Sequence, residues 1–494
     1  MTGFALLLFL VLPPADPDAL IAEGRMEEAR AALQTELSAA STDEARAVLC
    51  DRIGETYLLE GRWWQAESSF AKSLDHKETG RARYHRGRAF FEAGMEAYAD
   101  GTSPRAEILA LMNDAARELR RAVDLLPGDV DALVALALAE RYREDTDAEV
   151  AALEKALKLK PGHPAASIHL AWRRNAQDDR KAAKEILLAV AEADRTADHW
   201  KRLGRLAAAE GAESEAAGHF TAAALADPND REAYDGLWKV TAFRKRFGEV
   251  NAALGRILEK HESAHWARYY LGFSRLDDGK PKEAVAEFER AAALKPDFMD
   301  ARLMVAQVCR ERQLDPEKGL RVFLSVLEAD PENARARTAV AEIAFAFARG
   351  GNHGEAGRLF EALIVAEPSN PFHRMNLALT FKERGEFERA LATYEAAEKE
   401  FPFEPQIPND RGLLLMGAGR RAEAMAAFET ALDRDDEFLD TLENLGAYAR
   451  LEGDHEAALE WFSKALARVR REGGDPSKFR RYLDLVKGEM PARR

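Results

Sequence analysis

The sequence has little cysteine and no excess of basic residues. Its 494 residues include two cysteines, Cys50 and Cys309, too few for a disulfide framework or a four-thiolate zinc site. Lysine and arginine total 71 against 86 aspartates and glutamates, and a net charge of −15 disfavours binding to the phosphate backbone of nucleic acid. The 32 glycines and 19 prolines are ordinary levels, which exclude collagen and low-complexity disorder. The composition therefore predicts an ordered protein that does not bind nucleic acid.

The N-terminal segment from Phe4 to Leu12 is apolar throughout but short, and Pro13 and Pro14 follow it. A helix needs about 20 apolar residues to cross the hydrocarbon core of a membrane, so this segment does not span one. Its length is typical of the apolar part of a secretory signal. We expect residues 1–15 to be a signal peptide of an exported or periplasmic protein, with membrane association through the N-terminus as a related outcome. No lysine or arginine precedes Phe4, so a cytoplasmic protein with an apolar segment packed under its first helices is the alternative.

Proline and glycine recur with a fixed period through most of the chain. The prolines are separated by 34 to 37 residues or by about twice that: Pro127, Pro161, Pro228, Pro296, Pro331, Pro368 and Pro402. Gly385, Gly419 and Gly453 follow the same period of 34 residues. Glycine can adopt the left-handed conformation that ends a helix, and proline cannot continue the next one. Each period therefore predicts a helical hairpin.

Apolar residues within each period have the i, i+3, i+4 spacing of a helix, and no strand is needed to explain them. The period around Gly272 shows what the small and aromatic residues do in helix packing. Gly272 and Ala284 are small and let two helices approach, and Phe288, four residues after Ala284, fills the space between neighbouring hairpins. One hairpin alone could not bury that face, so the hairpins are expected to stack into an all-α protein.

These residues resemble the tetratricopeptide repeat family, whose 34-residue signature places Trp, Leu, Gly, Tyr, Ala, Phe, Ala and Pro at these offsets. The resemblance implies a right-handed α-solenoid, a superhelix of stacked helical hairpins. It covers residues 47–470 as about twelve repeats, with weaker matches in the units that start at 164, 231 and 300. An insertion lies near 97–113, where a longer helix or an excursion is expected, and the second helix of that unit is expected to begin near Asn113. Residues 16–46 are expected to form a partial N-terminal hairpin, and residues 471–494 a C-terminal capping helix and tail.

Two short motifs match chemical sites, and the repeat period explains both. His261, Glu262 and His265 spell H-E-x-x-H, which on one continuous helix would place two imidazoles on one face as zinc ligands. The period places them in the turn between two hairpins, so no zinc site is expected. Gly417 and Gly419 belong to a G-x-G-x-x-A pattern, which binds a dinucleotide after a strand, whereas a helix precedes it here. We therefore expect no metal, no cofactor and no enzymatic activity.

The resemblance implies that the first helix of each unit lines a concave groove that holds a segment of a partner. The groove offsets fall on Trp172, Lys201, Arg205, Trp266, Tyr269, Phe273, Met304, Phe372, Met375 and Asn376. Aromatic residues and methionine anchor peptides, and lysine and arginine bind their carboxylates. We expect Trp266, Tyr269 and Phe273 to be the main anchors, although a shift of one residue in register would place them in the core. Asp410 and Asn444 extend Asn376 into a polar row that could hydrogen-bond a bound main chain.

These expectations favour a non-enzymatic protein–protein interaction scaffold whose partner is a protein or peptide segment, without nucleic acid or a small-molecule cofactor. The alternative is an accessory or regulatory subunit of an enzyme encoded on a separate chain. Some members of the family clamp a C-terminal carboxylate with lysine and asparagine. The matching offsets here carry Asp51, Glu55 and Val134, which do not support that mode.

Overall fold

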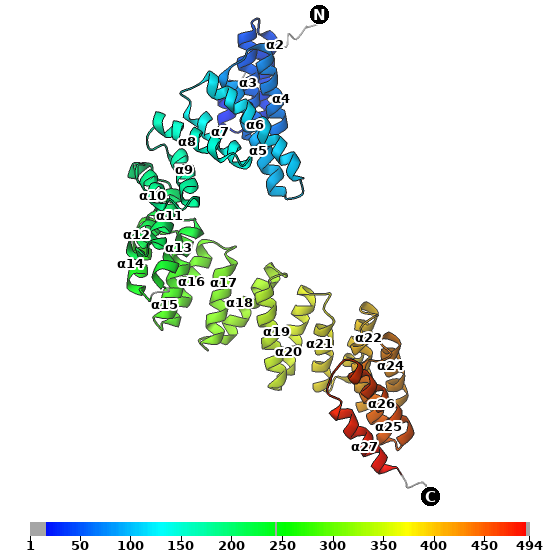
Figure 1. The fold of residues 1–494 in the computed structure, drawn as a ribbon. Coiled ribbons are helices and arrows are strands. Elements are labelled where there is room, and N and C mark those ends of the chain that lie inside the picture. Colours follow the sequence, from blue (N-terminus) through cyan, green and yellow to red (C-terminus); the bar gives the residue numbers. More distant parts are fainter. Residues whose placement is uncertain (1–15, 243–244, 491–494) are drawn as a thin grey trace, which may run out of the picture. The chain divides into compact units, whose positions relative to one another are not determined.

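The computed structural model describes residues 16–242 and 245–490, so the signal peptide expected for residues 1–15 lies outside the described part. The described residues form 27 α-helices and one short 3-10 helix, and no strand occurs among them. Successive helices pair into hairpins that stack on one another (Figure 1), which confirms the predicted all-α solenoid. The chain divides into two compact units, residues 1–262 and 263–494.

The first unit contains fourteen α-helices and the 3-10 helix η1. They are α1 (Pro17–Ala22), α2 (Met26–Ala39), α3 (Asp43–Leu59), α4 (Trp63–His76), α5 (Gly80–Asp100), α6 (Arg105–Leu125), α7 (Val130–Tyr142), α8 (Thr146–Leu159), α9 (Pro164–Ala176), α10 (Arg180–Leu188), η1 (Glu192–Asp194), α11 (Ala197–Ala209), α12 (Glu213–Ala226), α13 (Arg231–Thr241) and α14 (Phe247–Lys260).

The second unit contains thirteen α-helices. They are α15 (His265–Asp277), α16 (Pro281–Leu294), α17 (Met299–Glu311), α18 (Pro316–Ala329), α19 (Ala334–Arg349), α20 (His353–Ala366), α21 (Pro371–Glu383), α22 (Phe387–Glu400), α23 (Gln406–Gly417), α24 (Arg421–Arg434), α25 (Leu439–Leu451), α26 (His455–Arg471) and α27 (Ser477–Glu489).

The turn inside these hairpins uses a residue with left-handed backbone. In the α11–α12 hairpin this residue is Gly211, whose φ of 76° costs glycine little. Four other hairpins use Glu144, Asp178, Lys245 and Gln313 at the same place, all with positive φ. A non-glycine residue in this conformation costs about 1–2 kcal/mol, so packing elsewhere in the hairpin must hold the turn. This explains how units without the glycine mark still adopt the hairpin.

The two helices of a hairpin meet where a glycine of the first faces an aromatic ring of the second. A β-carbon on Gly272 of α15 would lie 2.5 Å from the ring of Phe288 of α16. The same arrangement joins Gly412 of α23 to Phe428 of α24, at 2.6 Å. Both rings are buried. Glycine at these positions is therefore needed for close approach of the helices rather than for backbone freedom.

The extra residues near 97–113 lengthen the α5–α6 hairpin, whose helices have 21 residues each. The expectation that the second helix begins near Asn113 is therefore wrong. The helix begins directly after Pro104, which has extended backbone and occupies the N-cap position. The added turns are packed, since Met112 of α6 lies against Gly94 of α5.

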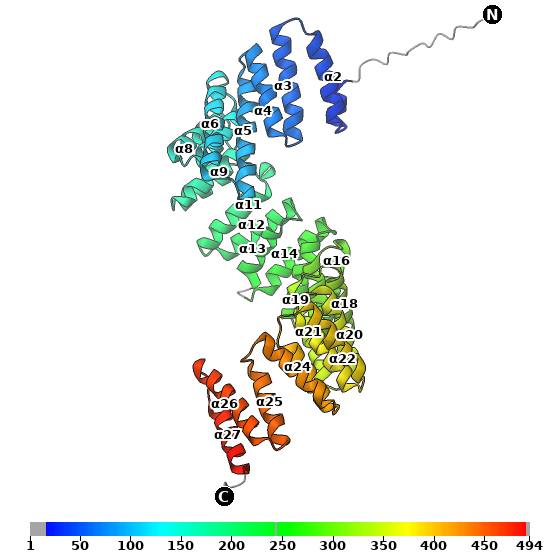
Figure 2. The same cartoon turned by 90° about the vertical axis from the view of Figure 1, so that its right-hand side faces the viewer.

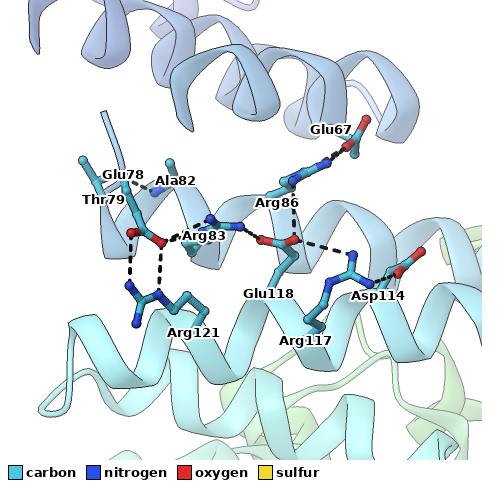
Figure 3. A network of polar contacts seen from close by, with 10 residues as sticks. All are labelled: Glu67, Glu78, Thr79, Ala82, Arg83, Arg86, Asp114, Arg117, Glu118 and Arg121. Carbon is cyan, nitrogen blue, oxygen red and sulfur yellow. Dashed lines mark hydrogen bonds and ion pairs between the residues drawn. The ribbon is translucent and has the colours of Figure 1, made fainter. Parts of the chain in front are cut away.

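A buried carboxylate ties the long hairpin to the preceding helix (Figure 3). Glu118 of α6 is 3% exposed, and its oxygens lie 2.6 Å from Arg83, 3.4 Å from Arg86 and 3.6 Å from Arg117. Arg86 also lies 2.6 Å from Glu67 of α4. A buried charge is tolerated when oppositely charged, hydrogen-bonded partners surround it, as they do here. The network therefore fixes the mutual placement of α4, α5 and α6.

The last helix closes the C-terminal end of the second unit. Helix α27 lies beside α26 (Figure 2) and buries Phe479, Leu483 and Val486. Arg480 and Arg481 on the same helix are exposed, so the outer face is polar, as the end of a solenoid requires. No helix within residues 16–242 or 245–490 is both long enough and apolar enough to cross a membrane.

Candidate functional site

Four cavities share one construction. Each lies between the first helices of two neighbouring hairpins: α9 and α11, α11 and α13, α17 and α19, and α21 and α23. The second helix of the earlier hairpin contributes a buried side chain to the lining, which is Leu187, Phe220, Phe323 or Tyr394. Their volumes are about 340, 480, 340 and 260 Å³, at the small end for ligand pockets. Cavities of this size fit single side chains of a bound segment.

The cavity between α9 and α11, the α9–α11 pocket, is basic. Two predicted groove residues, Trp172 and Arg205, line it together with Arg180 and Arg202. No carboxylate is among the described residues of its lining. Arg205 forms an ion pair with Glu232 outside the pocket lining. The pocket therefore combines an aromatic wall with a surplus of positive charge.

Trp172 is held in a fixed position by two arginines. Its side chain is 39% exposed, and the guanidinium carbons of Arg141 and Arg173 lie 4.5 Å and 4.9 Å from its ring centroid. Both arginines form ion pairs with Glu149 of α8, which is fully buried. Cation–π contacts of this kind stabilise an indole by about 0.5–2 kcal/mol. The aromatic wall of the pocket is thus preorganised.

Two other predicted groove residues are buried within the chain. Lys201 is 8% exposed, and its Nζ lies 2.7 Å from Asp230, 2.9 Å from Asp198 and 3.1 Å from Glu232. Burial opposes its charge, but hydrogen bonds to these three carboxylates outweigh burial and raise the pKa of Lys201 above its ordinary value. Met304 of α17 is likewise 8% exposed. The charge of Lys201 is therefore neutralised by the chain itself.

The three expected anchors form part of an aromatic core in the second unit. Trp266 and Tyr269 are each 9% exposed, and Phe273 is half-buried. The ring of Phe298, which directly precedes α17, lies 4.5 Å from Trp266 and 5.0 Å from Tyr269. Phe273 lies 5.3 Å from Phe288. The structure thus corrects the expectation that Trp266 and Tyr269 are surface anchors, because both rings are buried against Phe298, whereas Phe273 is half-buried beside Phe288.

The cavity between α21 and α23, the α21–α23 pocket, brings together three predicted residues. Phe372, Met375 and Asn376 line it from α21. Met375 is buried, whereas Phe372 is 55% exposed. Leu379 and Leu413, which also line the pocket, are 43% and 46% exposed. The pocket therefore has an apolar rim that remains open to solvent.

The polar row beside this pocket is hydrogen-bonded within the chain. Asp410 accepts hydrogen bonds from Gln406 at 2.6 Å and from Asn409 at 3.2 Å, and burial raises its pKa. Asn444 donates to Asn409 at 2.9 Å. Asn376 donates to a main-chain carbonyl one turn earlier in its own helix, at 2.7 Å. Since these groups already have partners, the pocket presents mainly apolar contacts.

Sequence reasoning missed Arg202 and Leu413 as pocket residues. In the unit that starts at residue 197, Arg202 takes the repeat position that Asn376 and Asp410 take in their units. His169 takes it in the unit that starts at 164. The row of polar residues at this repeat position could therefore have identified Arg202, if it had been extended to the repeats within residues 1–262.

The protonation of His169 gives a testable pH dependence. Burial, reinforced by the charges of Arg141 and Arg202, lowers the pKa of His169 from 6.5 to about 4. Between these values the unfolded chain binds a proton that the folded chain does not, so stability falls as the pH is lowered. At a pH of about 4, this histidine should lower the free energy of unfolding by about 3 kcal/mol.

We expect His169→Asn to remove most of that loss, measured by urea unfolding above and below this pH window. Burial also lowers the pKa values of His163, His199, His219 and His265, which remain in the variant, so a smaller acid sensitivity should persist. An unchanged pH dependence in the variant would contradict the assignment to His169.

The motifs that resemble chemical sites lie in turns. His261 follows the end of α14, with its Nε2 3.0 Å from the carbonyl of Leu225, while His265 begins the next helix. Gly417 ends α23, and Gly419 has a φ of 75° in the turn that follows. Within residues 16–242 and 245–490 there is no group of three or more histidine, cysteine, aspartate or glutamate side chains placed to hold a metal ion.

Comparison with known proteins gives one family and several relatives. The sequence profile of the family described as Tetratricopeptide repeat matches residues 113–164, 269–314, 310–371, 346–405 and 409–475, just over half of the chain. A protein of Arabidopsis thaliana named Protein CTR9 homolog is 27% identical over 276 residues, which are 54% of this chain and 25% of that protein. The chain thus spans about a quarter of the length of that relative.

Two solved structures are also similar. The C-terminal part of a TPR repeat-containing protein from Cytophaga hutchinsonii is 15% identical with a TM-score of 0.37, covering 50% of this chain and 99% of that one. A thermophilic TPR protein from Thermus thermophilus is 17% identical with a TM-score of 0.30, covering 39% of this chain and 98% of that one.

Proposed function

This chain belongs to the tetratricopeptide repeat family, and from that premise we propose that it holds a segment of a partner protein in the groove between its first helices. Repeats of this family indicate a protein–protein interaction scaffold, and the fold is typically non-catalytic. The observation that carries the groove proposal is the α21–α23 pocket with its exposed apolar rim.

The rim has the properties of an anchoring site. Phe372, Leu379 and Leu413 are large apolar side chains that surround one cavity and are each more than two-fifths exposed. Apolar side chains gathered in this way mark interaction sites, whereas single exposed ones are ordinary. The cavity of about 260 Å³ accommodates one apolar side chain of the partner, with Tyr394 as part of its floor.

Loss of the rim should strongly weaken partner capture without unfolding the protein. We expect the double variant Phe372→Ala and Leu413→Ala to weaken capture by about 30-fold or more, the effect of removing an anchor worth about 2 kcal/mol. Its stability should change by less than about 0.5 kcal/mol per site, since both side chains are exposed. Crosslinking mass spectrometry on tagged full-length protein in its native cells measures partner and site together.

The matched control is Phe403→Ala, which removes an 89% exposed ring that does not line the pocket. It should keep the wild-type crosslinks. If one recurrent partner survives in the double variant, and its crosslinks come from outside the pocket, the groove proposal fails. Were that partner an enzyme, the alternative role as an accessory or regulatory subunit would be favoured.

The apolar segment from Phe4 to Leu12 supports a further proposal, that the protein is exported, with retention in the cytoplasm as the alternative. Amino-terminal sequencing of the mature protein, together with its distribution between cell fractions, distinguishes the two.

A further inference from the structure

The α9–α11 pocket gathers positive charge within a chain whose net charge is −15. Of its three arginines, Arg205 is paired with Glu232, and Arg180 lies 3.2 Å from Asp178. Arg202 has no ion pair and no hydrogen bond among the described residues. It is the one pocket arginine that forms no ion pair with a described residue.

The environment of Arg202 makes that lack of a partner costly. Its Nε is buried and has no hydrogen-bond acceptor. Burial, together with the nearby charges of Arg205 and Arg141, lowers the pKa of Arg202 although Asp198 and Glu232 oppose the shift. A guanidinium in such a place is destabilised until an anion pairs with it. Asp198 and Glu232 act on Arg202 only at a distance and form no ion pair with it, so its guanidinium is available to an anionic group of a ligand.

The shape of the pocket specifies what kind of anion fits. The cavity of about 340 Å³ has apolar walls, including Leu206 and the fixed indole of Trp172, beside the guanidinium of Arg202. An acidic side chain matches both features, because its methylene stem packs on the walls and its carboxylate accepts paired hydrogen bonds from arginine. We propose that the α9–α11 pocket binds an aspartate or glutamate side chain of the partner segment.

This inference rests on the proposed function, because it names the chemistry of one residue in a partner segment held by the first helices α9 and α11. It does not involve Lys201, whose ammonium is already surrounded by Asp198, Asp230 and Glu232. The charge without an ion pair is that of Arg202, which follows Lys201 in the same helix.

The test uses full-length protein and two fluorescein-labelled peptides, one of alternating glutamate and leucine and one of alternating glutamine and leucine. Fluorescence anisotropy should show the glutamate peptide binding about tenfold or more tightly than the glutamine peptide. Arg202→Met should lose that preference while its urea unfolding midpoint stays equal or rises, because a half-buried charge without an ion pair is removed.

Two further variants keep the test decisive. Arg256→Met makes the same change in net charge at an exposed arginine of α14 that has no ion pair among the described residues, and it should bind as the wild type does. Arg180→Met changes an exposed arginine of the pocket, and it should weaken binding about threefold even if Arg202→Met fails to fold.

Equal binding of the two peptides, or equal effects of Arg202→Met and Arg256→Met, would overturn the proposal. A phosphoserine peptide that binds where the glutamate peptide does not would also overturn it and assign the pocket to a phosphoryl group. The Phe372→Ala and Leu413→Ala double variant separates this inference from the proposed function. If that variant loses native crosslinks while the wild type does not bind the glutamate peptide, only the assignment of the α9–α11 pocket is wrong.

Discussion

Replacing Phe288 with alanine should lower the free energy of unfolding of the second unit by about 3–5 kcal/mol. The ring is fully buried and lies 5.6 Å from Tyr269 and 5.3 Å from Phe273. It also packs directly on the backbone at Gly272, where there is no side chain to move into the space. The cavity left by the ring therefore cannot collapse, and its cost adds to the lost burial. Urea unfolding followed by circular dichroism measures the effect.

Phe403→Ala is the matched control, because it makes the same change at a ring that is 89% exposed. We expect it to alter the free energy of unfolding by less than about 0.5 kcal/mol. Similar losses in the two variants would mean that the ring of Phe288 does not fill the hairpin as described.

Replacing Glu149 with glutamine should destabilise the first unit by about 3–5 kcal/mol. The carboxylate is fully buried, lies 2.8 Å from Arg141 and forms a second ion pair with Arg173. Glutamine keeps the volume but leaves two partly buried guanidinium groups without a counter-charge. The same arginines stack on Trp172, so the intrinsic fluorescence of that indole should change together with the stability.

The control variant for this prediction lies on the same helix. Glu154 is 53% exposed on its side chain and lies 2.5 Å from Arg174. Because exposed ion pairs contribute about 0–1 kcal/mol, Glu154→Gln should be nearly neutral. If both variants lose the same small amount of stability, Glu149 does not organise the arginines around Trp172.

The repeat architecture could be predicted because its signals are local and recur. A glycine or another residue able to take positive φ ends the first helix, and small and aromatic residues at fixed offsets close the hairpin. The first helices α15, α19 and α21 begin at the residues that the period indicates, His265, Ala334 and Pro371. The start of α6 was missed because the inserted residues continue both helices, and no period applies to them.

The groove residues were harder to predict because exposure depends on neighbours outside the repeat pattern. Trp266 and Phe372 occupy the same position in their units, the second residue of the first helix, yet they are 9% and 55% exposed. Arg202 was missed for a related reason. Its charge matters because no described carboxylate forms an ion pair with it, and sequence spacing does not show that.

The sequence by itself determined the helical hairpins and the all-α repeat fold, since each hairpin depends on contacts between residues close along the chain. The tertiary structure alone decided which first-helix side chains reach solvent. Phe298 and Phe403 both lie in the loop before the next first helix, yet one packs 4.5 Å from Trp266 and the other is 89% exposed. Phe298 directly precedes α17, so that helix fixes the direction of its ring, whereas two further residues separate Phe403 from α23. The periodic pattern is the same in both repeats, and only the packing of the loop leaves one ring buried and the other exposed.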